Sequence, residues 1–199
     1  MLQDVSNILV GLSAVVVAIA AIIGLRQWRA ELTGRTKFEI ARKIALLAYQ
    51  FRDEFHAART TFTYAGESAG RPRKEGETRE ESNRLDERYA RFARLNRPQD
   101  TLRKLREATW EAEIILSKEI AQQIQPFEGA FQELAVAMET HFSYQMDFAR
   151  GRIRADQVEP AELWRLTTLV YGGSETDALR DSVNTAVATL TTQLKQYLT

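Results

Sequence analysis

The sequence predicts an all-α protein, with an N-terminal transmembrane helix followed by an elongated, mostly antiparallel helical bundle with coiled-coil-like packing. Residues 8–25 form an uncharged apolar run that nothing later in the chain resembles. The rest of the chain repeats its apolar residues at alternating spacings of three and four, as helices with one packed face do. Proline occurs only four times, and no long alternating run of β-branched residues indicates a strand.

Residues 8–25 read ILVGLSAVVVAIAAIIGL and are predicted to span a membrane. At about 1.5 Å per residue, this uncharged run covers about 27 Å, close to the hydrocarbon thickness of a bilayer. A cleavable signal peptide would need a basic start, whereas this chain starts with Asp4 and stays apolar beyond the small residues at 18–20. A buried soluble helix is the third interpretation, although such segments usually reach only about 10–14 residues. We therefore favour an uncleaved anchor.

The charges that flank this run predict its orientation. Asp4 is the only charged side chain before it, while six basic and two acidic residues follow within 26–43. Because Lys and Arg are enriched in cytoplasmic flanks, we expect residues 1–7 to be a short extracytoplasmic N-terminus and 26–199 to be cytoplasmic. The absence of cysteine agrees with a reducing compartment. The predicted membrane-interface residues are Arg26, Trp28 and Arg29.

Small residues recur on one face of the predicted span. Ala14, Ala18 and Ala21 lie near one another on a helix, and Ala20 and Gly24 form a second pair of small residues. Small residues let helix backbones approach closely in lipid, so the anchor has a face suited to self-association. Ala and Gly are also common in membrane helices that have no such role.

Within residues 26–199, the apolar periodicity predicts one helical domain. We expect its first helix to run from about Thr36, after a break at Gly34, to about Thr63. A charged loop at 66–84 follows, which is expected to be flexible because Ala69 is its only apolar side chain. The predicted packing positions of the first helix are Ala41, Ile44, Ala48, Phe51, Phe55, Ala58 and Phe62.

Two further helical regions are expected in the middle of the chain. The first runs from about residue 80 to 125 and should kink or restart at Pro98, because proline lacks the amide donor and clashes with the preceding turn. The second follows Pro126 and stops near Gly151. Their predicted packing positions include Leu102, Leu105, Thr109, Ala112, Leu116, Ile120, Phe127, Phe131, Leu134, Met138, Phe142 and Met146.

The last part of the chain predicts a short helix at 161–171 and a final helix at 179–197. Two glycines at 172–173 should end the short helix. Ser174 and Asp177 have the spacing of a helix-capping pair, with Asp in place of the preferred Glu or Gln. The final helix places Leu179, Val183, Ala186, Leu190, Gln193 and Tyr197 on one stripe.

Three segments carry a resemblance to a known group: WRAELTGRTKFEIARK at 28–43, ATWEAEIIL at 108–116 and LVYGG at 169–173. They resemble segments of a loose group of uncharacterised bacterial single-pass membrane proteins with a helical cytoplasmic domain. The resemblance implies a place in the bacterial inner membrane, with the main domain in the cytoplasm. It implies no activity and no catalytic residue.

The sequence offers little catalytic or metal-binding chemistry. It contains no cysteine and no phosphate-binding loop. Asp53 and His56 have the i, i+3 spacing of half a di-iron motif, but Met138 stands three residues before His141, so the second half is missing. We therefore predict that the protein is not an enzyme and has no catalytic, metal or cofactor-binding residues.

Charge is segregated along the chain. Residues 84–106 carry eight bases and three acids, a net of +5, whereas residues 107–139 carry seven acids and one base, a net of −6. Pairing between these blocks, within one chain or between copies, is the favoured explanation. Anionic lipid or another anionic ligand is the alternative, while the scarcity of interleaved aromatic residues disfavours nucleic acid. The candidate anion or partner patch consists of Arg84, Arg88, Arg91, Arg94, Arg97, Arg103, Lys104 and Arg106.

Two functions follow from these features. The first is a membrane-anchored helical interaction, scaffold or regulatory protein at the cytoplasmic face of the inner membrane, with membrane lipids and a protein partner or further copies of itself as its contacts. The alternative is a membrane-bound sensor or effector that binds an anionic ligand, a lipid headgroup or a nucleotide, through residues 84–106.

Overall fold

The computed structural model describes residues 2–64, 66–173 and 177–198, and for residues 2–16, 18 and 155 it describes the backbone only. All the regular structure in these residues is helical, which confirms the all-α prediction. The elements in chain order are α1 (Leu2–Ala58), α2 (Arg79–Ile115), α3 (Lys118–Gln122), α4 (Gln125–Ala149), the short 3₁₀ helix η1 (Ala155–Gln157), α5 (Pro160–Tyr171) and α6 (Ala178–Leu198).

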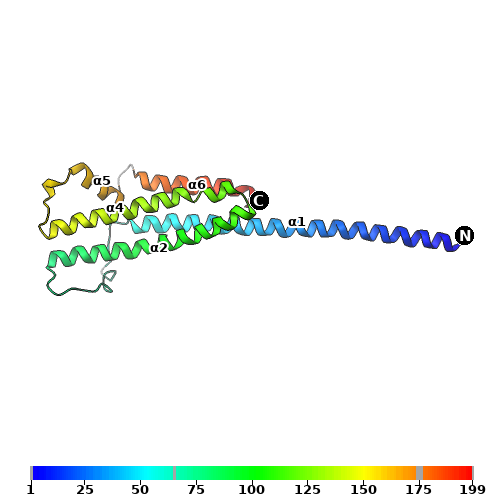
Figure 1. Ribbon diagram of the computed structural model, residues 1–199, viewed down its shortest axis with the longest axis horizontal. Coiled ribbons are helices and arrows are strands. Elements are labelled where there is room, and N and C mark those ends of the chain that lie inside the picture. The colour runs from blue at the N-terminus through cyan, green and yellow to red at the C-terminus, as the bar shows by residue number, and fades with distance from the viewer. Residues whose placement is uncertain (1, 65, 174–176, 199) are drawn as a thin grey trace.

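Four of these helices form an antiparallel bundle (Figure 1). The second half of α1 packs on α2 and α6, and α4 packs on the same two helices from the opposite corner. Successive long helices run in opposite directions, the up-down arrangement of a four-helix bundle. α5 packs on α4 at the end of the bundle far from the N-terminus, and we call this end the distal end.

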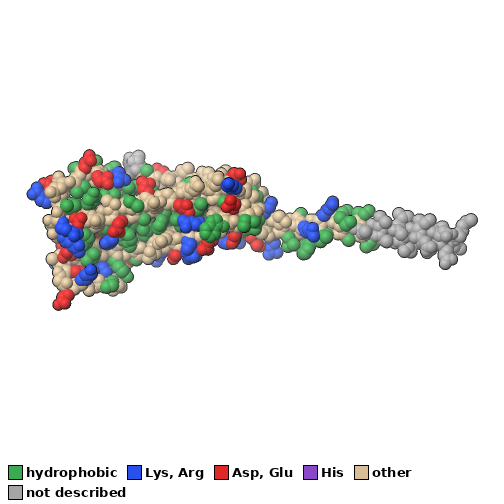
Figure 2. Space-filling model, in the orientation of Figure 1, with side chains coloured by type: hydrophobic (Ala, Val, Ile, Leu, Met, Phe, Trp, Pro, Cys, Tyr) green, Lys and Arg blue, Asp and Glu red, His purple; other side chains and the backbone are tan. Residues whose placement is uncertain are grey.

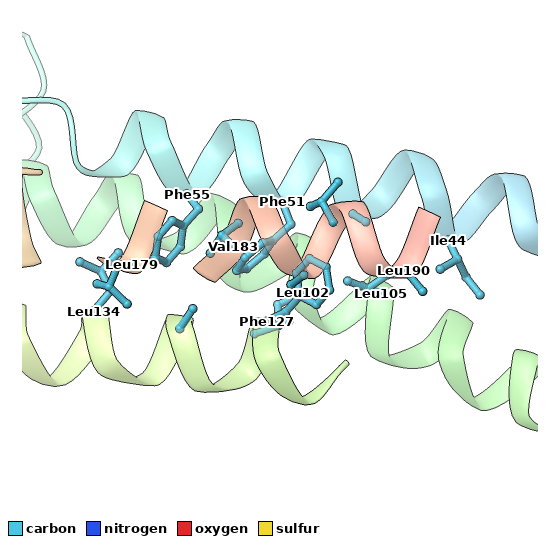
Figure 3. Close-up of a cluster of buried hydrophobic side chains, with 14 of the residues drawn as sticks. Ile44, Phe51, Phe55, Leu102, Leu105, Phe127, Leu134, Leu179, Val183 and Leu190 are labelled. Carbon is cyan, nitrogen blue, oxygen red and sulfur yellow. The ribbon is translucent and has the colours of Figure 1, made fainter. Parts of the chain in front are cut away.

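Apolar side chains from all four helices fill the bundle core. The rings of Phe51 and Phe55 stack with their centroids 5.5 Å apart, and Phe127 of α4 meets Phe51 edge-on at the same distance. Figure 3 shows leucines of α2 and α6 pointing into the same space. The predicted packing positions confirmed as buried are Ala41, Ile44, Ala48, Phe51, Phe55, Ala58, Leu102, Leu105, Thr109, Ala112, Ile120, Phe127, Leu134, Met138, Phe142, Met146, Leu179, Val183, Ala186 and Leu190.

The predicted break at Gly34 is wrong, because α1 is one helix of 57 residues. A side chain at Gly34 would meet nothing within 4 Å. The hydroxyls of Thr33 and Thr36 donate to the carbonyls of Arg29 and Leu32, one turn earlier in the helix. One glycine inside a helix costs only about 1 kcal/mol. A helix already formed on both sides of the glycine therefore continues through it.

α1 ends at Ala58, several residues before the predicted end near Thr63. Phe62, predicted to pack, is instead 77% exposed. After α1 ends, Arg91 and Arg94 of α2 bind the backbone carbonyls of residues 60–62 and hold this segment in its non-helical path.

α2 begins at Arg79, inside the predicted loop 66–84. Thr78 caps it, since its side chain accepts from the N–H of Glu81 while the Glu81 carboxylate accepts from the N–H of Thr78. The helix passes through Pro98 without restarting. Proline removes one hydrogen bond, and the buried position of its ring between the helices compensates for that loss.

α1 leaves the bundle as a single helix that runs to the N-terminus (Figure 1). Ile40 is the first of its described side chains to be buried, and we call residues 19–39 the stalk. Among the side chains that the structure describes, no helical stretch is both long and apolar enough to cross a bilayer. Most of the predicted span lies at 8–16 and 18, outside those described side chains, so the anchor remains a prediction.

Candidate functional site

Buried titratable side chains gather at the distal end, where α1 ends, α2 begins and α5 packs. Arg59, Arg91, His141 and Asp177 are each 5% exposed or less. They come from four separate parts of the chain, brought together by the up-down topology. Because burying an uncompensated charge is costly, each of these groups needs partners that the fold must place.

Arg59 forms a buried ion pair with Asp177, with 2.9 Å between Nη2 and Oδ1. Arg59 follows the last residue of α1 and also donates to the carbonyls of Thr168 and Leu169 near the end of α5, at 3.1 and 2.9 Å. Asp177 caps α6 by accepting from the N–H of Arg180. Each charge therefore meets a helix terminus of favourable polarity, a cation at a C-terminus and an anion at an N-terminus.

Gly172 is required next to this pair for two reasons. Its φ is +65°, a conformation that L side chains rarely adopt. A Cβ at this position would also lie 2.9 Å from Oδ2 of Asp177 and 3.5 Å from Nη2 of Arg59. The glycine that the sequence marks as the end of α5 is thus also what lets the ion pair close.

A second buried group surrounds the ring of Tyr171. The guanidinium of Arg91 lies 4.5 Å from the centroid of this ring and donates to the carbonyls of Thr60 and Thr61. The Tyr171 hydroxyl donates to Oε1 of Glu87 at 2.7 Å and lies 3.4 Å from Nε2 of His141. This arrangement ties α2, α4 and α5 together.

Burial shifts the protonation of this group. It lowers the pKa of His141 below its ordinary 6.5; Glu87 opposes that shift, and Arg84 and Arg91 reinforce it. It also raises the pKa of the Tyr171 hydroxyl, which the hydrogen bond to Glu87 reinforces. His141 is therefore held neutral, and Tyr171 is held as a hydrogen-bond donor, across the neutral pH range.

The segment after α1 is fastened to α2 by Arg94. This side chain forms an ion pair with Glu67 and donates to the carbonyls of Thr60 and Phe62. The hydrogen bond from Arg94 lowers the pKa of Glu67. These contacts fix the path of residues 60–67 across the start of α2.

The predicted flexible loop at 66–84 contains a dense polar cluster around Arg71. Its guanidinium binds both carboxylate oxygens of Glu77, at 2.8 and 3.0 Å, and donates to Asp86 at 2.6 Å and Ser82 at 3.0 Å. The hydrogen bonds that Glu77 accepts, first from Arg71 and then from the backbone N–H of Lys74, lower its pKa to about 2. A bidentate pair of this kind fixes geometry as well as charge.

The candidate patch at 84–106 divides into paired and unpaired members. Arg88 pairs with Glu139, and Arg106 with Glu128, each at 2.7 Å, so two of its eight members pair with the acidic block within the chain. Arg103 pairs with Glu107 on its own helix. Arg91 and Arg94 bind the segment at 60–67, as described above. Among the described residues, no ion pair involves Arg84, Arg97 or Lys104.

A cleft of about 310 Å³ lies between α1, α2 and the segment at 60–67. Four alanines and the exposed cation Arg97 are among its lining residues. Glu54, which also lines it, already accepts from the hydroxyl of Thr101 at 2.6 Å. Its lining residues are Glu54, Ala57, Ala58, Thr60, Tyr64, Glu67, Ala90, Ala93, Arg94 and Arg97.

Residues 66–70, GESAG, have the G-x-S-x-G spacing of a hydrolase nucleophile elbow, a match that our sequence analysis missed. In the structure they form turns between α1 and α2, not the strand-to-helix junction that exposes such a nucleophile. The side chain of His56 lies 3.3 Å from Asn184, and His141 lies beside Tyr171. The spacing at Ser68 is therefore coincidental.

The predicted membrane-interface residues lie far from the distal end. Arg26, Trp28 and Arg29 are exposed on the stalk (Figure 2 shows its basic and hydrophobic side chains). Asp53 pairs with Arg52. No group of three or more His, Asp or Glu in the described part of the chain is arranged to hold a metal ion.

Sequence reasoning missed the pairs Arg59–Asp177 and Glu87–Tyr171. Their members are 118 and 84 residues apart, so no local pattern connects them. The only local signal was Asp177 at a helix start, which was assigned as the partner of Ser174 in a cap. Ser174 lies outside the described residues, and Asp177 itself caps α6.

The chain was also compared with models of known protein families, with curated proteins and with solved structures. No match was found in any of the three comparisons. The function must therefore be inferred from the molecule itself.

Replacing Asp177 with Asn should destabilise the fold strongly. Asn keeps an oxygen that can cap α6, but it leaves the buried Arg59 charge without its partner, which costs about 3–5 kcal/mol. Urea unfolding of the full chain in detergent, followed by helical circular dichroism, measures the loss. The matched control is Asp53→Asn, which removes an exposed ion pair and should change little. Equal effects of the two variants would contradict the role of the buried pair.

Stability should fall as the pH drops below about 6.5, and His141 should cause part of that fall. Because the folded state lowers the pKa of His141, the unfolded chain binds more protons below its ordinary pKa, and acid favours unfolding. His141→Gln should flatten the dependence of the unfolding free energy between about pH 7 and pH 5. His56→Gln, which keeps His141, should retain it. Parallel curves for wild type and His141→Gln would refute this expectation.

Proposed function

We propose that the protein is a membrane-anchored helical interaction protein, a scaffold or regulatory module whose bundle faces the cytoplasm from the bacterial inner membrane. The observation that carries this proposal is the continuity of α1. One helix runs from the predicted span at 8–25, through the stalk, into the core of the bundle. An anchored bundle needs a spacer between membrane and core, and the long exposed helix ahead of the core can serve as one. A soluble bundle does not require such a spacer.

The length of the stalk sets the distance between membrane and bundle. If the span ends near Arg26, the helix continues for 14 residues before Ile40 enters the core, a distance of about 21 Å. Arg26 and Arg29 are exposed at the start of this stretch, where lipid phosphates would lie, and Trp28 suits the headgroup region. The bundle would then stand clear of the bilayer and present its sides to protein partners.

The packing of α1 would make the connection between anchor and bundle stiff. Seven of its residues from Ile40 to Ala58 are buried apolar core residues, so the stalk and the bundle share one element. A change in the tilt or pairing of the anchor would therefore move the bundle as a body. This is a suitable arrangement for a module that reports or organises contacts at the membrane.

The anchor predicts that the full chain fractionates with inner membranes and is released only by detergent. Changing Val15 and Ala18 to Arg should release it, because a charge at the centre of a spanning helix costs about 2.5–3.5 kcal/mol. Ala30→Arg in the stalk is the control and should leave the chain in the membrane.

Cysteine labelling tests the orientation, since the native chain has no cysteine. Ser6→Cys should react with an impermeant maleimide in intact spheroplasts, and Lys74→Cys only after permeabilisation. A chain found in the soluble fraction, or the opposite labelling pattern, would refute the anchored proposal.

The second candidate, binding of an anionic ligand, is favoured by one observation. Arg97 is an exposed cation with no ion pair among the described residues, and it lines the cleft between α1 and α2. The paired arginines of the 84–106 block are less available, because a ligand would have to displace their carboxylates or carbonyls.

This candidate predicts that nucleotides or anionic lipids raise the thermal unfolding midpoint of the full chain, and that Arg97→Glu abolishes the shift. Arg103→Glu, which changes an exposed arginine already paired along its own helix, is the control and should keep the shift. No shift with any anion, or equal loss in both variants, would exclude the cleft as an anion site.

A further inference from the structure

One face of the stalk carries large apolar side chains. Leu25, Trp28 and Leu32 are 48, 58 and 45% exposed. Their spacings of three and four residues place them along one side of α1. Figure 2 shows hydrophobic side chains exposed on the stalk between the bundle and the grey segment. We call these three residues the stalk stripe.

The stalk stripe lies on the side of α1 that points away from the bundle. At about 100° per residue, its direction differs by about 130° from that of the core-facing residues of α1. The same three-and-four spacing, continued into the bundle, reaches Leu46 and Tyr49, both exposed. Another helix can therefore approach the stalk stripe without meeting the bundle.

The stalk needs such a neighbour on physical grounds. A helix in water gains most of its stability from packing an apolar face, and this stretch also contains Gly34 and two threonines, which weaken it. With the proposed anchor, lipid would cover much of Leu25 at the end of the span and of Trp28 at the headgroups, whereas Leu32 stays exposed to water. A partner that covers the stripe would supply the missing packing.

We propose that the partner is a second copy of this chain, packed in parallel along the stalk stripe as a two-stranded coiled coil. The inference rests on the proposed anchoring, because anchors in one bilayer hold two copies parallel and at high effective concentration. The sequence continues the stripe at the same spacing into the predicted span, through alanines at 14, 18 and 21. Small residues suit helix pairing in lipid, and larger apolar residues suit it in water.

The seam changes from small residues within the predicted span to larger apolar residues beyond it. This change favours a second copy of the chain as the partner. A partner without an anchor would use only the part of the seam outside the membrane, whereas a second copy uses both parts in register. The next seam positions are Arg35 and Glu39, which form an exposed ion pair within the chain at 3.1 Å. In a parallel pair Arg35 would face Arg35 and Glu39 would face Glu39 in successive layers, so the apolar seam ends at Leu32 and these charges stay paired within each chain.

Disulfide trapping of the full chain in its native membrane tests the proposal, and the absence of cysteine makes every introduced thiol unique. Leu25→Cys and Leu32→Cys place thiols on the stalk stripe, and Gln27→Cys and Ala30→Cys place them on other sides of the same stalk. A disulfide requires Cβ atoms about 4 Å apart, so only facing positions join readily. After mild oxidation, the stripe variants should give severalfold more of a band at twice the chain mass than the control variants.

A further substitution tests the packing itself. Trp28→Glu in the Leu32→Cys chain should reduce the dimer band severalfold, because it puts a charge into the seam. Gln27→Glu in the same background should not. Both variants change the exposed stalk, so neither should alter the folding of the bundle.

Each of the other possible outcomes would contradict either the pairing or the anchor. Equal trapping at all four positions, no trapping, or a band of another mass would overturn self-pairing along this face. Membrane fractionation of the same samples separates the two proposals. A chain in the membrane without stripe-specific trapping refutes the pair and leaves the anchor, whereas a soluble chain refutes the anchor.

Discussion

The buried ion pair between Arg59 and Asp177 is the contact on which the distal end of the bundle depends. It joins the end of α1 to the end of α5 and the start of α6, so one guanidinium positions three helix termini. A buried charge pair is costly to desolvate, and it is tolerated only when the remaining donors are also satisfied. Here the carbonyls of Thr168 and Leu169 accept from Nη2 and Nε of Arg59. The pair thereby favours this one arrangement of the last two helices over others with the same apolar pattern.

α1 connects this end of the molecule to the proposed anchor. Within the bundle its apolar face is buried against α2 and α6, while in the stalk the opposite side carries exposed apolar residues. One helix thus has two apolar faces on different stretches of its length. The face within the bundle is buried inside the chain, and the face on the stalk is available to a neighbour. If copies pair along the stalk, the bundles are held side by side and their distal ends point away from the membrane. In that proposed arrangement the distal end would be the part of the bundle farthest from the anchor.

Arginine is used here mainly as a structural residue. The basic block at 84–106 reads in the sequence as a surface for anions, yet Arg91 is completely buried and Arg94 is bound to backbone and carboxylate oxygens. A planar guanidinium with five donors can satisfy several carbonyls of an irregular segment at once, which lysine cannot do. After α1 ends, the carbonyls of residues 60–62 accept their hydrogen bonds from these arginines. A net charge counted along a sequence therefore says little about the charge that remains available at the surface.

The sequence alone determined the helical class, most of the core positions and the uncharged run at 8–25, because apolar periodicity and length are local properties. It also located the short helix that ends at Gly172. Tertiary structure decided where α1 stops, that α1 continues through Gly34, that α2 continues through Pro98, and which charges are buried. The physical reason is distance along the chain. Helix ends and buried charges are set by partners far away in sequence, as with Arg59 and Asp177. The packing face of a helix, by contrast, can be predicted from the spacing of its own apolar residues.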